Sequence, residues 1–270
     1  MKQEILYMRV IAMLMVIFYH SVCFYTRIWG AEYLYVPAWQ FVASFLNYID
    51  MPAFVFISGY LYAFMKFEKG KYGNERTFLK EKAKRLMIPY IVWTAINIML
   101  IPSTFSVAWI FKGYSHLWFL MMLMMVFVIV VISQRFWSRF NMVKYLVWIG
   151  SLIITTLVIS KFHIDSWLCW KQTLRYLPYF IIGIMFIQYR QLLMSFCLKY
   201  KFLTIIVALV ILVSVSYTNS IEWSFRGWYQ LSSMFIYASV SILLLTICTI
   251  FSDYSPPPLS KIAFQDYCDL

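Results

Sequence analysis

Arg9 and His20 are ionisable residues inside the first long apolar segment of the sequence. A charge at the centre of a membrane-spanning helix costs about 2.5–3.5 kcal/mol on insertion scales, so each such residue needs a reason. Eleven residues advance a helix by about 1100°, about 20° past three turns, and by about 16 Å. Both residues therefore lie on one helix face, which we expect to face a polar interior. The alternatives are a snorkelling surface anchor for Arg9 and a hydrogen-bonded packing role for His20.

Asp50 is the third ionisable candidate inside an apolar segment. Counted along two antiparallel spans, Asp50 falls at about the depth of His20, so a pair between them is geometrically allowed. Such a carboxylate would fix the imidazole tautomer and stabilise the imidazolium that forms when His20 acts as a general base. In the alternative interpretation, Asp50 caps a half-helix that opens at Met51-Pro52. The sequence leaves both open.

The composition identifies the elements that must position these residues. Of 270 residues, 63% are hydrophobic and 13% are charged, and the mean hydropathy is +0.75. Soluble domains carry about 25% charged residues, and the apolar runs here are long enough for a hydrocarbon core of about 30 Å. We predict an all-α, multi-pass transmembrane helix bundle of about eight spans, forming a single domain over 1–270. The predicted helices are 5–25, 39–65, 86–101, 116–133, 143–160, 174–189, 201–217 and 228–251.

The net charge of +12 comes from basic residues that fall between the apolar runs, above all in 66–85. Charges in that position orient a membrane protein, with the basic-rich loops in the cytoplasm. We therefore expect the chain in the cell (inner) membrane with its N-terminus cytoplasmic, the lipid bilayer as a partner, and no nucleic acid. The five cysteines are scattered without a metal-binding spacing, so no metal is expected.

Four motifs stand in order along the chain: the pair Arg9 and His20, and the stretches 52–60, 78–90 and 116–120. In this order they resemble the Arg-x10-His, P-x-F-F-F-x-S-G-Y, R-L-x-x-P-Y and H-L-W-F-L motifs of the membrane-bound acyltransferase 3 family. More weakly, 177–183 resembles its later Y-F-x-x-G. The four ordered motifs cover 9–120, and the remainder is supported mostly by hydropathy.

The resemblance implies O-acyl transfer, usually of acetyl, from acyl-coenzyme A to a hydroxyl of a sugar or other cell-envelope acceptor. It also implies that His20 is the residue on which catalysis depends and that Arg9 belongs to the acyl-donor site. The chemistry agrees independently, because an alcohol needs a base to take its proton as it attacks a thioester. The expected donor substrate is thus acyl-CoA, in the first instance acetyl-CoA.

Coenzyme A carries phosphates and comes from the cytosol, so its site requires cations on the inner side. Lys82, Lys84 and Arg85 are expected there together with Arg9, just before the start of a helix. The alternative is that these residues only set the topology and attract anionic lipid.

Four further residues are candidates for the cavity or the acceptor site. Ser58 and Tyr60 flank a glycine and could leave a polar gap for the acyl arm, or could mark close helix packing by small residues. His116 and Trp118 fall at the predicted outer interface, where His116 could meet a carbohydrate or glycolipid acceptor. The alternative for His116 is an interfacial polar residue paired with Trp118.

The end of the sequence departs from the family pattern. Leu259-Ser260-Lys261-Ile262-Ala263-Phe264 resembles the approach to a closing span, but the chain then reads Gln265-Asp266-Tyr267-Cys268-Asp269-Leu270 and stops. The closing helix is therefore expected to be missing. Two other functions are alternatives: a transporter or flippase of an envelope component, since buried charges also mark translocation paths, and an inactive truncated acyltransferase relative.

Overall fold

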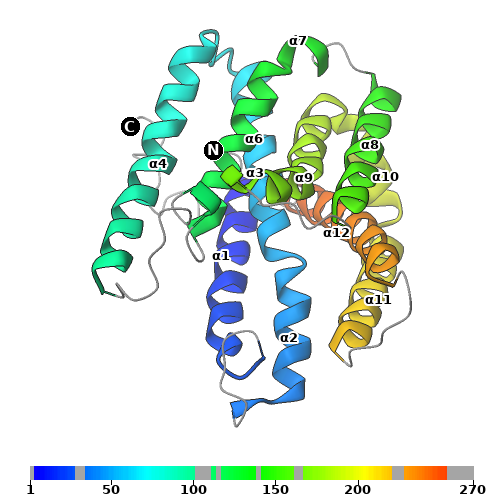
Figure 1. Cartoon of the computed structure of the whole chain (residues 1–270). Helices are drawn as coiled ribbons and strands as arrows, with labels where there is room; N and C mark the ends of the chain where they lie inside the picture. Colours follow the sequence, from blue (N-terminus) through cyan, green and yellow to red (C-terminus); the bar gives the residue numbers. More distant parts are fainter. Residues whose placement is uncertain are drawn as a thin grey trace. The chain divides into compact units, whose positions relative to one another are not determined.

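The computed structural model describes residues 3–27, 34–100, 111–113, 117–137, 141–160, 167–220 and 228–253 (Figure 1). Helices make up nearly all of these residues, and no strand occurs among them. The predicted all-α class is thereby confirmed. The α-helices are α1 Gln3–Cys23, α2 Pro37–Asn47, α3 Asp50–Ala63, α4 Glu75–Leu100, α6 Trp118–Ile132, α7 Gln134–Trp137, α8 Met142–Ser160, α9 Trp170–Gln188, α10 Arg190–Lys199, α11 Lys201–Ser220 and α12 Trp228–Asp253.

Each of the eight predicted segments coincides with one or more of these helices, and the fold is a multi-pass membrane bundle. By length and composition, fewer than eight of the described helices qualify as spans. Five stretches do, one of which is Pro37–Glu68 with α2 and α3 counted together, and a sixth is added if α9 and α10 are counted as one bent span. The helix α6 has only 15 residues and α4 carries a charged first half, which explains the lower number. The expected absence of a closing helix concerns residues after Asp253, which lie outside the described residues.

The predicted helix 39–65 is interrupted, because α2 ends at Asn47 and α3 begins at Asp50. Pro52 provides the physical reason. Within a continuous helix its ring would collide with the carbonyl of Tyr48, four residues earlier, and it has no N–H to donate. The chain therefore turns at Tyr48 and Ile49 and restarts, with the Ala53 N–H donating to the Ile49 carbonyl over 2.9 Å. A single turn of π-helix, Phe64–Glu68, follows α3.

The chain forms two compact units, one of residues 1–58 with 188–270 and one of residues 59–187. We call them the first and the second unit. The division does not test the prediction of a single domain over 1–270, which stays a prediction.

In the first unit, α1 packs against α2 and α12, and α11 packs against α12 and α2 (Figure 1). The rings of Tyr7 on α1 and Phe251 on α12 lie 5.5 Å apart. The hydroxyls of Thr204 on α11 and Thr246 on α12 lie 3.1 Å apart, and Thr246 is fully buried. Polar groups of this kind join helices in a bundle whose outer surface is apolar.

In the second unit, α6 packs against α4, and aromatic rings fill the space beside them. The ring of Tyr62 lies within 6.2 Å of the rings of Tyr72, Phe78, Trp137 and Phe180. Trp137 is fully buried, and its indole N–H donates to the Val130 carbonyl over 2.8 Å, which satisfies its one polar atom. We call this set, together with Phe127, the aromatic cluster of the second unit.

Candidate active site

The helix α1 carries both residues of the Arg-x10-His spacing. It is uninterrupted from Gln3 to Cys23, so Arg9 and His20 do lie on one side of it, about 20° apart around the axis. Ile5, Ala12 and Cys23 mark the buried stripe of α1, and the two ionisable residues follow the edge of that stripe. His20 is half-buried, whereas Arg9 is exposed.

A backbone carbonyl orients the His20 ring. Its Nδ1 lies 2.7 Å from the carbonyl oxygen of Val16, one turn earlier on α1. A carbonyl oxygen only accepts hydrogen bonds, so Nδ1 carries the proton in this contact. The neutral imidazole then has its lone pair on Nε2, which is the atom able to act as a base. In this contact the Val16 carbonyl fixes the tautomer, a role that the sequence leaves open to Asp50.

Asp50 is fully buried at the first turn of α3. Its Oδ1 accepts the N–H of Met51, while its Oδ2 has no hydrogen-bond partner among the residues that the structure describes. The carboxylate interacts electrostatically with His20. Both interpretations therefore stay predictions: Asp50 is the first residue of α3, and its carboxylate interacts electrostatically with the imidazole.

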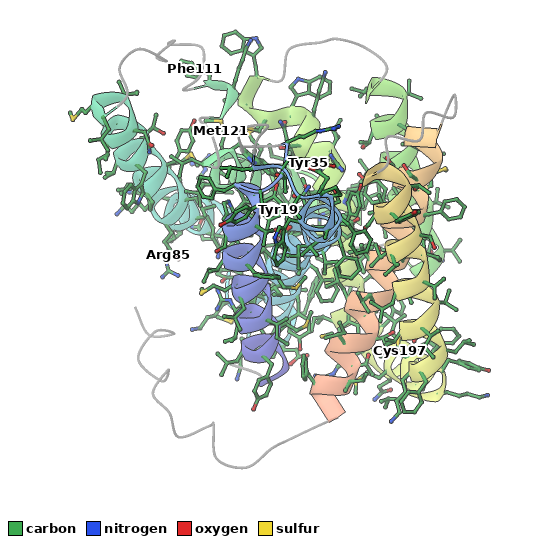
Figure 2. All side chains as sticks on the ribbon, turned by 90° about the horizontal axis from the view of Figure 1, so that it is seen from below. Tyr19, Tyr35, Arg85, Phe111, Met121 and Cys197 are labelled. Carbon is green, nitrogen blue, oxygen red and sulfur yellow. The ribbon has the colours of Figure 1, made fainter. Side chains whose placement is uncertain are left out.

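Tyr19 and Cys23 complete this group, and neither is among the site residues predicted from the sequence. The Tyr19 ring meets the His20 ring edge-on, with centroids 5.2 Å apart (Figure 2 labels Tyr19). The fully buried Cys23 thiol hydrogen-bonds with Tyr19 and interacts with Asp50. Cys23 stands one turn after His20 on the buried stripe, a spacing that could have revealed it.

The predicted donor-side cations of the second unit lie within α4, not before its start as the sequence suggested. The Asn74 side chain accepts the N–H groups of Arg76 and Thr77, at 3.0 and 3.3 Å, and so caps a helix that already begins at Glu75. Lys84 and Arg85 are exposed, and Figure 2 shows the Arg85 side chain extending outward from α4.

Lys82 is half-buried instead, with its ammonium 4.9 Å from the Phe127 ring centroid and 5.5 Å from that of Phe78. A second lysine, Lys66, occupies a similar place on the π-turn. Its Nζ donates to the Tyr62 hydroxyl over 3.4 Å and lies 5.6 Å from the Trp137 ring centroid. From the sequence alone, Lys66 is only one of the basic residues of 66–85 that orient the protein.

The cavity candidates make packing contacts. The Ser58 hydroxyl donates to the Phe54 carbonyl of its own helix over 2.9 Å. Tyr60 is fully buried, with its ring centroid 6.0 Å from that of Phe186. Trp118 is half-buried beside Tyr176, at 5.8 Å between centroids. His116 lies outside the described residues. These contacts favour close packing around Ser58 and Tyr60 over a polar gap.

The group thus consists of a histidine with an oriented ring and a buried carboxylate that interacts with it electrostatically, within a bundle of apolar helices; an imidazole of this kind is able to accept and return a proton. The comparison with known families indicates the type of reaction. A model of the acyltransferase 3 family, described as an acyltransferase domain, matches residues 3–267, and the chain belongs to this family. The protein is therefore a membrane acyltransferase. No curated protein and no solved structure matched it.

Proposed function

We propose that this enzyme moves an acetyl group from acetyl-CoA to a hydroxyl of a sugar in a cell-surface polysaccharide or lipid-linked glycan. It would do so in the inner membrane, with its N-terminus in the cytoplasm. The observation that carries the proposal is the held imidazole of His20 beside the buried carboxylate of Asp50. Together with membership of the acyltransferase family, this arrangement supports a role for His20 as the general base that activates an alcohol nucleophile.

In the proposed reaction, Nε2 of His20 removes the proton of the acceptor hydroxyl while its oxygen attacks the thioester carbonyl carbon. The carbon–sulfur bond then breaks, and the imidazolium returns the proton to the leaving thiolate of coenzyme A. Asp50 stabilises the imidazolium between the two steps through its negative charge. The Val16 carbonyl keeps Nδ1 protonated, so Nε2 stays available as the base.

Arg9 is the proposed cation of the donor site in the first unit, and its exposed guanidinium can reach a phosphate. Lys82, Lys84 and Arg85 belong to the second unit, and their assignment to the donor rests on the sequence alone. For Lys82 the aromatic cluster already provides favourable contacts for its charge.

The test uses membranes that contain the full chain and radiolabelled acetyl-CoA, with label counted in the polysaccharide and glycolipid fractions. We expect His20→Ala to lower the rate by about 10²–10⁴-fold, the usual contribution of a general base. Ser21→Ala is the matched control, because Ser21 is the next residue on α1, is exposed and bonds only its own helix in the described contacts. Equal rates for His20→Ala and the wild type would remove His20 from the mechanism. Acetate uptake into vesicles without labelled glycan would instead indicate transport.

A further inference from the structure

The short helix α10 is the feature that the proposed reaction leaves unexplained. Its ten residues span about 15 Å, half of what a hydrocarbon core of about 30 Å requires. Its inner side is packed, since Leu193 is 8% and Cys197 is 4% exposed. Its outer side presents large apolar residues, with Leu192 and Phe196 both 56% exposed.

Contacts within the first unit place α10 at one end of that unit. The Cys197 thiol hydrogen-bonds with Thr246 and Thr249, which lie in the last two turns of α12 (Figure 2 labels Cys197). Thr246 also meets Thr204 in the first turn of α11. The helix α10 therefore lies where α11 begins and α12 ends, at one end of two candidate membrane spans.

The segment that forms α10 and α11 carries charge of one sign, whereas α12 ends on Asp253. From Arg190 to Ser220 the sequence contains basic residues and no acidic one. The ammonium of Lys199 lies 5.2 Å from the Tyr200 ring centroid, and that of Lys201 lies 5.3 Å from the Phe202 ring centroid. The rings of Tyr200 and Phe202 are exposed. Lysines beside exposed aromatic rings are typical of the boundary between acyl chains and headgroups.

The exposed residues of α10 form an apolar side and a polar side. At about 100° per residue, Leu192 and Phe196 lie within about 40° of each other, while Gln191 and Ser195 lie on the adjoining exposed side. Lys199 falls between the two sides. Such a helix suits the membrane plane, with one side among acyl chains and the other in water.

We propose that α10 and the start of α11 form an interfacial docking surface for anionic phospholipid. Leu192 and Phe196 insert among the acyl chains, and Lys199 and Lys201 contact the headgroup phosphates. Charge complementarity carries the choice of lipid, because a run of cations without a carboxylate attracts an anionic leaflet. The proposal is independent of acetyl transfer.

The first test compares thermal unfolding of the full chain in nanodiscs of phosphatidylcholine with and without phosphatidylglycerol. We expect phosphatidylglycerol to raise the Tm of the wild type and the Lys199→Gln/Lys201→Gln variant to lose most of that rise. Lys71→Gln/Lys80→Gln is the control, because it removes the same charge from exposed lysines of the second unit. An undiminished rise in the Lys199→Gln/Lys201→Gln variant, or an equal loss in the control, would overturn the proposal. A higher KM for acetyl-CoA in the Lys199→Gln/Lys201→Gln variant, with the lipid effect unchanged, would also overturn the proposal. It would assign the two lysines to the binding site of the acyl donor.

The second test probes the orientation of α10 in proteoliposomes with a charged maleimide. The Leu192→Cys variant should react far more slowly than Ser195→Cys, and detergent should remove the difference. The wild type gives the background, since the four cysteines among the described residues are buried. Equal rates at 192 and 195 before detergent would show that α10 does not lie in the interface.

Discussion

Gly59 and Phe180 bring the backbones of α3 and α9 into direct contact in the second unit. A β-carbon at position 59 would lie 2.8 Å from the carbonyl carbon of Phe180, 2.9 Å from its Cα and closer still to its carbonyl oxygen. Real β-carbons do not approach backbone atoms so closely. The glycine of the Ser58-Gly59-Tyr60 segment is therefore a packing residue, as small residues at membrane helix interfaces often are.

The Gly59→Ala substitution should destabilise the second unit by about 1–3 kcal/mol, because backbone must move to accept the methyl group. The measurement is the loss of folded protein with temperature or denaturant in detergent. Gly150→Ala on α8 is the matched control, since its new β-carbon would meet nothing within 4 Å. That substitution should be neutral or stabilise by up to about 1 kcal/mol. Two equally stable variants would disprove the close contact.

We expect the negative charge of Asp50 to affect the rate of acetyl transfer through its interaction with His20. Asp50→Asn keeps an oxygen for the Met51 N–H, so α3 should still begin correctly and the Tm should change little. The rate of acetyl transfer should fall roughly 10–100-fold, corresponding to about 1.5–3 kcal/mol for a partner of a charged group.

A double-mutant cycle separates this role from simple capping. In a His20→Ala background, Asp50→Asn should have little further effect on the rate, because groups that act as a unit are not additive. Additive losses, or a loss of activity that follows a loss of folded protein, would leave Asp50 with only a structural role at the start of α3.

Arg9 is exposed, so replacing it should change the stability by no more than about 0.5 kcal/mol. If its guanidinium binds donor phosphate, Arg9→Ala should raise the KM for acetyl-CoA by about tenfold or more, the value of one charged hydrogen bond. Arg9→Lys should recover part of this, since lysine keeps the charge but loses the bidentate geometry. The control is Met13→Ala, 57% exposed and one turn further along α1. An unchanged KM in Arg9→Ala would restrict Arg9 to anchoring at the membrane surface.

The sequence by itself determined the helical membrane class and the helices, because the length of an apolar run is a local property of the chain. It also determined that Arg9 and His20 share a side of α1, since eleven residues of one helix set that angle. The break before α3 was readable in principle from Pro52, whose clash with the preceding turn is likewise local.

Only the tertiary structure decided which groups from different segments meet. Asp50 interacts with His20 because α1 packs against α2, the helix that precedes Asp50 in the chain. The periodicity within either helix does not predict this contact. Gly59 meets Phe180, and Lys82 meets Phe127, across long separations in sequence.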